Sequence, residues 1–406
     1  PTRRSSDLLT AKNYADGSGV VYVYDAHGNL TSATDREGAT QTFTYNARDE
    51  LIRIDYPAGQ WLQFTYNAAG QRLTSLDQTG HLLTYHYDAV GRLSSMDDET
   101  DLTIVRYEYD AAGQLVRKTL GNGVYTTYTY DAAGQLLTLT NCQPDATVLS
   151  FFNYTYDSRG RRIAMATHYG DWTYEYDDLG QLTHAVLVST DPDVPSQDLR
   201  YVYDPLGNRI YTEENGVRRD YTTNNMNQYT RVGDTTYVFD RDGNLISETS
   251  VESTTTYGYD MENNLVAITH GDSSYYLKYG AFGELLGVNA GGNWVSIVTD
   301  GMSFSQVVGQ YDAFGTRLAT YDYGLDMLTI RHDDYQWVCF NPAGEVSELV
   351  PMDGWLPSNI VSEARSVLNL NLAASTTGEA TAFSDQYRLF VESSAGDENG
   401  LSSALK

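Results

Sequence analysis

The sequence predicts an all-β fold in which tandem β-hairpin repeats wind into a large curved sheet, a partial hollow shell. Three observations support this prediction. The 406 residues include 34 Tyr and 35 Gly but only 9 Pro, which suits many strands and tight turns. One short motif recurs about fifteen times along the chain. The strands that these copies require are too numerous to surround a solid core.

The motif is clear at its first occurrence, in Tyr22, Tyr24, Asp25, Gly28 and Leu30. The Asp or Asn after the second aromatic residue recurs at positions 25, 46, 67, 88, 110, 131, 157, 177, 204, 224, 240 and 260, with looser copies at Gly280, Asp312 and Asn341. The first six copies are 21 or 22 residues apart. A fixed period in this range is typical of one repeat architecture rather than of unrelated domains.

Each motif position has a physical role in a hairpin. Aromatic residues two positions apart lie on the same face of a strand and suit a half-buried sheet surface. The Asp or Asn, present in 14 of 15 copies, can accept hydrogen bonds from the turn that it begins. Gly follows three residues later in 12 of 15 copies, and Asp49, Asn227 and Asn263 replace it in the others. These types tolerate positive φ best, which predicts a type I turn closed by a left-handed residue with a bulge.

We therefore expect the structural residues of the repeats to be their turns and their aromatic pairs. The turn residues are Asp25, Gly28, Asp88, Gly91, Asp110, Gly113, Asp131, Gly134, Asp177, Gly180, Asp240 and Gly243. The aromatic pairs are Tyr22 and Tyr24, Tyr85 and Tyr87, Tyr107 and Tyr109, and Tyr128 and Tyr130. The rings are expected to pack across strands, with their hydroxyls hydrated or hydrogen-bonded. The alternative is that exposed rows of rings stack on sugars, although five Trp are too few for a Trp-lined site in every repeat.

Four copies place an Arg before the apolar residue of the return strand. These residues are Arg72, Arg162, Arg209 and Arg317. The sequence suggests that each of these copies contains one extra residue, accommodated by a longer turn or a bulge. The Arg could pair with an Asp or stack on a Tyr, but we expect a solvated surface position.

Strand arithmetic favours the shell. About fifteen hairpins give about 30 strands, which extend for about 140 Å at about 4.8 Å per strand. Closed in one turn, such a wall would be about 45 Å across, too wide for side chains to fill. A shell would have a radius of gyration well above the roughly 22 Å of a compact globule of this length.

The chain is expected to contain three regions. Residues 1–8 resemble a translated sequencing adapter and are set aside as an artefact, so the true start is expected to lie elsewhere. Residues 9–346 form the repeat region. Residues 347–406 lack the motif and are expected to be a truncated segment, with a short helix at 358–368.

The repeated motif resembles the YD repeat of the Rhs proteins, which also occurs in Tc-toxin C subunits, bacterial wall-associated proteins and teneurins. The resemblance covers about residues 20–346. It implies a hollow β-shell that holds a variable C-terminal toxin domain, often released by self-cleavage. It also implies a secreted or cell-surface bacterial protein active in interbacterial competition.

The chain departs from that family in two respects. The self-cleavage motif of bacterial Rhs cores contains Asp-Pro-x-Gly-Leu, and the nearest match here is Asp204, Pro205 and Gly207, inside an ordinary repeat. We expect this match to be a turn. Residues 347–406 are not expected to contain a toxin domain. The resemblance therefore carries over the shell role but not the protease.

The sequence contains no constellation of residues that indicates an enzyme. The seven His are scattered, without metal-ligand spacing, and each is expected to be a solvated or cross-strand residue. The turn at Asp240 lacks the Glu that a calcium loop requires, and Gly291 and Gly292 are expected to form a hairpin tip. Cys142 and Cys339 have no recognisable partner, and Cys339 is expected to be a buried apolar residue. We expect no cofactor and no metal.

The net charge of −28 argues against nucleic acid and anionic membranes as partners, and no apolar run is long enough to span a membrane. The predicted function is a shell segment that encloses or presents a C-terminal toxin domain absent from this chain. The expected partners are the rest of the shell and that toxin domain. The alternative is a cell-surface module that binds a carbohydrate or a protein.

Overall fold

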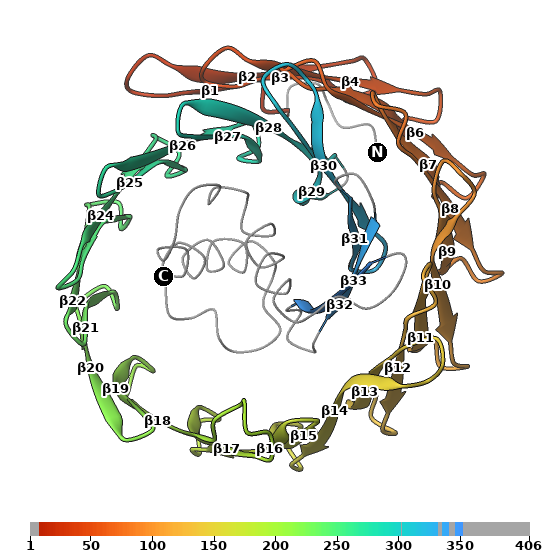
Figure 1. Ribbon diagram of the computed structural model, residues 1–406. Coiled ribbons are helices and arrows are strands. Elements are labelled where there is room, and N and C mark those ends of the chain that lie inside the picture. Colours follow the sequence, from red (N-terminus) through yellow and green to blue (C-terminus); the bar gives the residue numbers. More distant parts are fainter. Residues whose placement is uncertain (1–7, 302, 332–334, 341–345, 352–406) are drawn as a thin grey trace. The chain divides into compact units, whose positions relative to one another are not determined.

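The computed structural model describes residues 8–301, 303–331, 335–340 and 346–351. Within these residues the chain forms 33 β-strands and no helix (Figure 1). The all-β fold of tandem hairpins predicted from the sequence is confirmed. Residues 1–7 and the helix expected at 358–368 lie outside the described residues. The predicted region boundaries remain predictions.

Contacts divide the chain into two units. The first takes in Pro1–Arg106 and Tyr257–Val338, and the second takes in Tyr107–Thr256. The strands within the first unit are β1 (Ala11–Asn13), β2 (Gly19–Tyr24), β3 (Leu30–Thr34), β4 (Thr40–Tyr45), β5 (Leu51–Asp55), β6 (Trp61–Tyr66), β7 (Arg72–Asp77), β8 (Leu82–Tyr87), β9 (Leu93–Asp97), β25 (Leu265–His270), β26 (Ser273–Tyr279), β27 (Leu285–Ala290), β28 (Asn293–Asp300), β29 (Ser303–Tyr311), β30 (Arg317–Tyr323) and β31 (Met327–Arg331).

Among the described residues, thirteen strands lie wholly within the second unit. They are β11 (Leu115–Leu120), β12 (Tyr125–Tyr130), β13 (Leu136–Cys142), β14 (Val148–Tyr156), β15 (Arg162–Thr167), β16 (Gly170–Tyr176), β17 (Leu182–Ser189), β18 (Gln197–Tyr203), β19 (Arg209–Glu214), β20 (Val217–Thr223), β21 (Tyr229–Val232), β22 (Thr235–Phe239) and β23 (Leu245–Thr249). Four strands cross a unit boundary, namely β10 (Thr103–Tyr109), β24 (Thr254–Tyr259), β32 (Tyr335–Phe340) and β33 (Val346–Pro351).

The motif turns share one hydrogen-bond pattern, which the first copy illustrates. The Asp25 N–H donates to the Asn29 carbonyl at 2.9 Å, and the Gly28 N–H donates to the Asp25 carbonyl at 3.1 Å. Asp25 Oδ1 accepts from the amides of His27 and Asn29. Gly28 has φ +89°, and the register shifts by one residue between Val23, which pairs with Ser32, and Tyr24, which pairs with Leu30. These features are those of a type I turn with a bulge.

The three motif copies that lack Gly keep the same backbone. Asp49, Asn227 and Asn263 have φ values of 60°, 60° and 62°. A short polar side chain carries a smaller penalty in the left-handed region than other side chains do. Asx residues can therefore close this turn in place of Gly.

Gly180 gives a clean test of this backbone requirement. It has φ +88°, and a Cβ added there would meet no atom within 4 Å. We expect Gly180→Ala to lower the free energy of unfolding by about 1–2 kcal/mol through backbone strain alone. Gly180→Asn should cost clearly less. Urea unfolding of both variants checks this, and equal costs would contradict it.

The four copies with Arg contain no extra residue, so the prediction of an inserted residue is wrong. Tyr66 pairs with Arg72 just as Tyr24 pairs with Leu30. The same pairing joins Tyr156 with Arg162, Tyr203 with Arg209 and Tyr311 with Arg317. Arg thus occupies the position that Leu occupies elsewhere, and the next apolar residue becomes the bulged one. Leu73, Ile210 and Leu318 are accordingly exposed.

The opposite edge of the early hairpins carries a second set of similar turns, which the sequence analysis missed. Their first residues, Asp35, Tyr56, Asp77 and Asp98, each accept a backbone hydrogen bond from the residue three positions later. All four are buried, with relative exposures of 4–8%. The signal that could have revealed them is a second Asp–x–x–Gly, ten residues after the first, as at Asp35 and Gly38.

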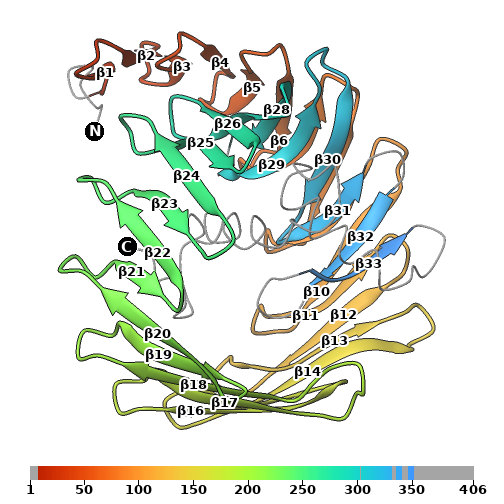
Figure 2. The same ribbon diagram turned by 60° about the vertical axis from the view of Figure 1, so that its left-hand side comes forward.

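The main core of the first unit lies between two layers of strands. The early layer is β1–β9 with their turns, and the late layer is β25–β31 with theirs. In both views β27–β31 lie beside early strands (Figures 1 and 2). One buried cluster combines early residues such as Ile54 and Phe64 with late residues such as Val298 and Tyr311. Strands distant in sequence therefore bury the same apolar surface.

The second unit has a smaller buried cluster within consecutive hairpins. Leu139, Phe152 and Tyr154 form it, from strands β13 and β14. Leu139 and Phe152 are paired directly across these two strands. This cluster is local in sequence, unlike the core of the first unit.

Candidate functional site

The predicted turn and aromatic residues lie in successive hairpins and do not converge on one cavity. Within the described repeats, the first aromatic of the motif is buried or half-buried, as at Tyr22 and Tyr107. The turn residues lie at the hairpin ends, where Gly28 and Gly180 are exposed. Their role in the structure is repetitive and geometric.

In seven copies of the motif, the second tyrosine is hydrogen-bonded to the segment that precedes its repeat. Tyr66 Oη donates to the Leu51 carbonyl at 2.6 Å, and Tyr87 Oη donates to the Arg72 carbonyl at 2.9 Å. Equivalent bonds join Tyr24 to Leu9, Tyr130 to Leu115, Tyr156 to Leu136, Tyr176 to Arg162 and Tyr203 to Leu182. We call this series the tyrosine ladder. The motif tyrosine is thus used as a link between repeats.

A second series of bonds joins neighbouring turns. The side-chain amides of Gln71, Gln135 and Gln228 donate to the carbonyls of Gly91, Gly160 and Gly243. The turn of each of these repeats is therefore held to the next turn by a side chain. Both series fix neighbouring hairpins at a constant spacing.

Removal of one bond of the tyrosine ladder should have a measurable but small effect. We expect Tyr130→Phe to lower the free energy of unfolding by about 0.5–1.5 kcal/mol, because the ring stays and the 2.9 Å bond to the Leu115 carbonyl is lost. Hydrogen exchange of the amides of β11 and β12 measures the local loss. An unchanged exchange rate would show that the bond does not stabilise the repeat.

Three of the four motif arginines stack on aromatic rings, so the expected solvated position is wrong for them. The Arg72, Arg162 and Arg209 guanidinium carbons lie 4.3, 4.3 and 5.3 Å from the ring centroids of Phe64, Tyr154 and Tyr201. The reason is their register, because they occupy the inward Leu position of the motif. The face of an aromatic ring attracts the guanidinium cation, so the aliphatic part of the Arg side chain can be buried while its charge remains stabilised.

Arg72 also joins the two layers of the first unit. Its guanidinium binds Asp300 through two hydrogen bonds, of which Nη2–Oδ1 is 2.8 Å long. Both side chains are 12% exposed. Burial alone would lower the pKa of Arg72, but the hydrogen bond and charge of Asp300 outweigh burial and raise the pKa. The pair is a charged contact inside the protein.

Tyrosine hydroxyls make further contacts between the layers. Tyr22 Oη donates to the Ala281 carbonyl at 2.7 Å, and Tyr56 Oη donates to the Thr299 carbonyl. Gly301 lies so close to Ile54 that a Cβ on Gly301 would overlap the Ile54 side chain. We call this set of contacts, with the Arg72 pair, the interlayer interface.

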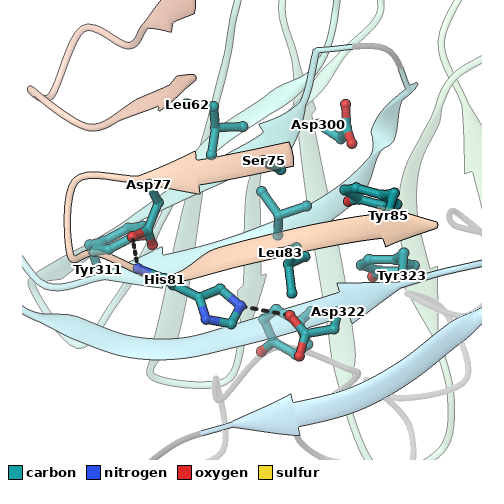
Figure 3. A pocket seen from close by; sticks show the side chains of 12 residues that line it. Leu62, Ser75, Asp77, His81, Leu83, Tyr85, Asp300, Tyr311, Asp322 and Tyr323 are labelled. Carbon is teal, nitrogen blue, oxygen red and sulfur yellow. Dashed lines mark hydrogen bonds and ion pairs between the residues drawn. The ribbon is translucent and has the colours of Figure 1, made fainter. Parts of the chain in front are cut away.

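A small cavity of about 30 Å³ lies in the first unit beside these contacts (Figure 3). Three carboxylates, Asp77, Asp300 and Asp322, line it together with His81 and Tyr311. Its volume suits about one water molecule and is far below that of a substrate pocket. Burial raises the pKa of Tyr311, and the charge of Asp77 raises it further. The cavity is therefore a small space of mixed polar and apolar lining, in which carboxylates, His81 and tyrosines lie close together.

His81 departs from the expectation that each His is solvated or merely cross-strand. It is 6% exposed and lies between two carboxylates, Asp322 and Glu99. His27, His86 and His184 instead pair with Asp49, Asp97 and Asp198 near the surface. No spacing in the sequence marks His81, because its partner Asp322 lies 241 residues away.

The other candidate residues have structural surroundings. Asp204 and Asp240 begin ordinary repeat turns, and each accepts two backbone amides. Gly291 and Gly292 form the two-residue tip of the β27–β28 hairpin. Cys142 is a buried free thiol in β13, and the side chain of Cys339 lies outside the described part of the structure.

Among the described residues, no group of three or more His, Cys, Asp or Glu side chains is arranged to hold a metal ion. The same part of the chain also lacks any helix with the length and apolarity needed to cross a bilayer.

The sequence matches the family model described as Teneurin YD-shell in three overlapping segments, 4–105, 36–173 and 77–221. Together these span residues 4–221, more than half of the chain. The chain belongs to the YD-shell family. Residues 239–274 of this YD-shell chain also match the RHS Repeat model. No curated protein matches the sequence.

Solved structures with the same fold come from Tc toxins. The crystal structure of TcdB2-TccC3 is 14% identical in sequence, with a TM-score of 0.60. The match covers 85% of this YD-shell chain and 22% of the TcdB2-TccC3 chain. TcdB2-TccC3 without its hypervariable C-terminal region is 16% identical with a TM-score of 0.54, covering 85% and 22%. A TccC3 mutant of the Photorhabdus luminescens Tc holotoxin pore is 14% identical with a TM-score of 0.52, covering 86% and 23%. The chain thus spans less than a quarter of the length of these proteins, and the likeness shows the fold.

Proposed function

We propose that this chain is a structural segment of a β-shell that encloses or presents a C-terminal toxin domain. The carrying observation is the YD-shell match over residues 4–221. The tyrosine ladder supports a structural role, because the repeated tyrosines are used to hold hairpins together. The similar TcdB2-TccC3 is described in one form as lacking a hypervariable C-terminal region, which supports a variable domain following the shell.

The proposal includes a secreted or cell-surface bacterial location and a role in competition between bacteria. Its support is the family and the description of the similar structures as toxins. We also propose that the segment itself is not catalytic. Two observations support this part of the proposal. The polar groups clustered around His81 are bound to one another, and the cavity beside them has a volume of only about 30 Å³.

Protease protection tests the enclosing role. The complete gene would be expressed, and the domain encoded after the repeats would also be produced alone. We expect trypsin to digest the isolated domain quickly and to leave it intact within the full protein. Equal digestion of both forms would contradict enclosure.

Two variants of the full protein sharpen the test. Asp300→Ala breaks the buried pair with Arg72 and should expose the domain to trypsin. Asp220→Ala removes a partner of Arg218 at the surface, where the side chain of Asp220 is 66% exposed and that of Arg218 is 53% exposed. This variant should leave protection unchanged. An equal response to both variants would show that protection does not depend on the interlayer interface.

A further inference from the structure

The His81 cluster, comprising His81, Glu99, Asp322 and Thr329, joins the early and late layers of the first unit. His81 lies in the turn before β8, Glu99 lies in the turn after β9, and Asp322 and Thr329 lie in β30 and β31. His81 Nε2 is 2.7 Å from Asp322 Oδ1, and His81 Nδ1 is 3.1 Å from Glu99 Oε2 (Figure 3 labels His81 and Asp322). Thr329 Oγ1 donates to the other oxygen of Asp322.

This geometry favours the protonated form of the ring. An ionised carboxylate only accepts hydrogen bonds, whereas a neutral imidazole has one donor and one acceptor nitrogen. Both ring nitrogens of His81 lie within hydrogen-bond distance of carboxylate oxygens, and an imidazolium satisfies both contacts by donating from each nitrogen. A neutral His81 would lose one of the two contacts.

The neighbouring groups favour the same charge. Asp77, from β7, accepts the His81 backbone amide, and its second oxygen accepts from Tyr311 of β29. The nearby cation Arg72 binds Asp300 of β28, and Arg317 of β30 reaches Thr79. The phenols of Tyr85, Tyr321 and Tyr323 line the adjoining cavity. His81 therefore lies close to several carboxylates, while the contacts of Arg72 and Arg317 named above are made to Asp300 and Thr79.

We propose that the His81 cluster is a proton-controlled attachment between the two layers, closed when His81 is protonated and released when it is neutral. Asp322 is fully buried, and His81 is the cation that binds it. Loss of the His81 proton leaves that carboxylate buried without a counter-charge, which is strongly unfavourable. Movement of β30 and β31 away from the early layer would let water reach Asp322.

The direction of the pH effect follows from the pKa of His81. Burial alone would lower this pKa, but the hydrogen bond and charge of Asp322, with the charges of Glu99 and Asp77, outweigh burial and raise it. The attachment is therefore at full strength below the ordinary His pKa of about 6.5. It weakens as the pH rises through the raised pKa of the folded state.

Hydrogen exchange of the full chain measures the attachment. Protection factors of the β30 amides, corrected for the intrinsic effect of pH, are expected to fall by about tenfold or more as His81 loses its proton. His81→Gln should show the low protection at every pH. His86→Gln is the matched control, because His86 also contacts an aspartate, at 2.7 Å from Asp97, but is 47% exposed. This control should follow the wild type.

A second measurement does not depend on a folded variant. NMR titration of the wild-type protein with labelled histidine should show His81 doubly protonated at neutral pH, with its proton lost over the same pH range as the β30 protection. A neutral His81 at pH 7 would overturn the proposal. So would β30 protection that stays constant while His81 titrates.

Discussion

Replacement of Asp300 by Ala should lower the free energy of unfolding of the first unit by about 3–5 kcal/mol. The substitution leaves the Arg72 guanidinium buried without its carboxylate, although both side chains of the pair are only 12% exposed. Arg72 is also confined by Phe64, whose ring centre lies 4.3 Å away. Urea unfolding followed by hydrogen exchange of β7 and β28 peptides measures the effect in the unit where it arises.

A double variant separates the two charges from the packing. Leu30 occupies in its repeat the position of Arg72, which shows that an apolar side chain fits this place in the motif. Arg72→Leu with Asp300→Leu should therefore recover most of the lost stability, because no buried charge remains. A double variant as unstable as Asp300→Ala would show that the fit of the pair, rather than its charge, is decisive.

Phe64→Ala should cost about 3–5 kcal/mol, since it opens a cavity in the core between the two layers. Phe64 is 1% exposed and belongs to the cluster that contains both early and late residues. Trp61 lies in the same strand, so its fluorescence in urea reports the unfolding of this region. Phe314→Ala provides the control, because Phe314 is 95% exposed and its loss should change stability by less than about 0.5 kcal/mol. Similar costs for both variants would contradict the burial argument.

The hairpins could be predicted because their determinants are local. A turn that begins at Asp25 is complete by Asn29, so residue types and spacing alone specify it. The same motif predicted that Asp49, Asn227 and Asn263 would share the Gly conformation, and they have φ near 60°. The sequence pattern suggests an extra residue in the Arg copies because it aligns an apolar residue such as Leu73 with Leu30. In the structure Arg72 holds the position of Leu30, and Leu73 lies in the bulge.

The interlayer interface and the His81 cluster could not be predicted, because no periodicity joins the two layers. Arg72 lies 228 residues from Asp300, and His81 lies 241 residues from Asp322. Neither aspartate has a distinctive neighbour in the sequence. Only the packing of one layer against the other shows that these charges are buried together.

The long separations across the interlayer interface also order the events of synthesis. A rung of the tyrosine ladder, such as Tyr66 with Leu51, needs only 15 residues and can form as the chain leaves the ribosome. Asp300 follows Arg72 by 228 residues, which takes on the order of 10 to 45 seconds at translation rates of roughly 5–20 residues per second. During that interval the early layer presents Ile54 and Phe64 without the late strands that bury them. The early strands of this unit thus acquire their full core only after the late strands have been made, and until then their apolar surface is open to aggregation.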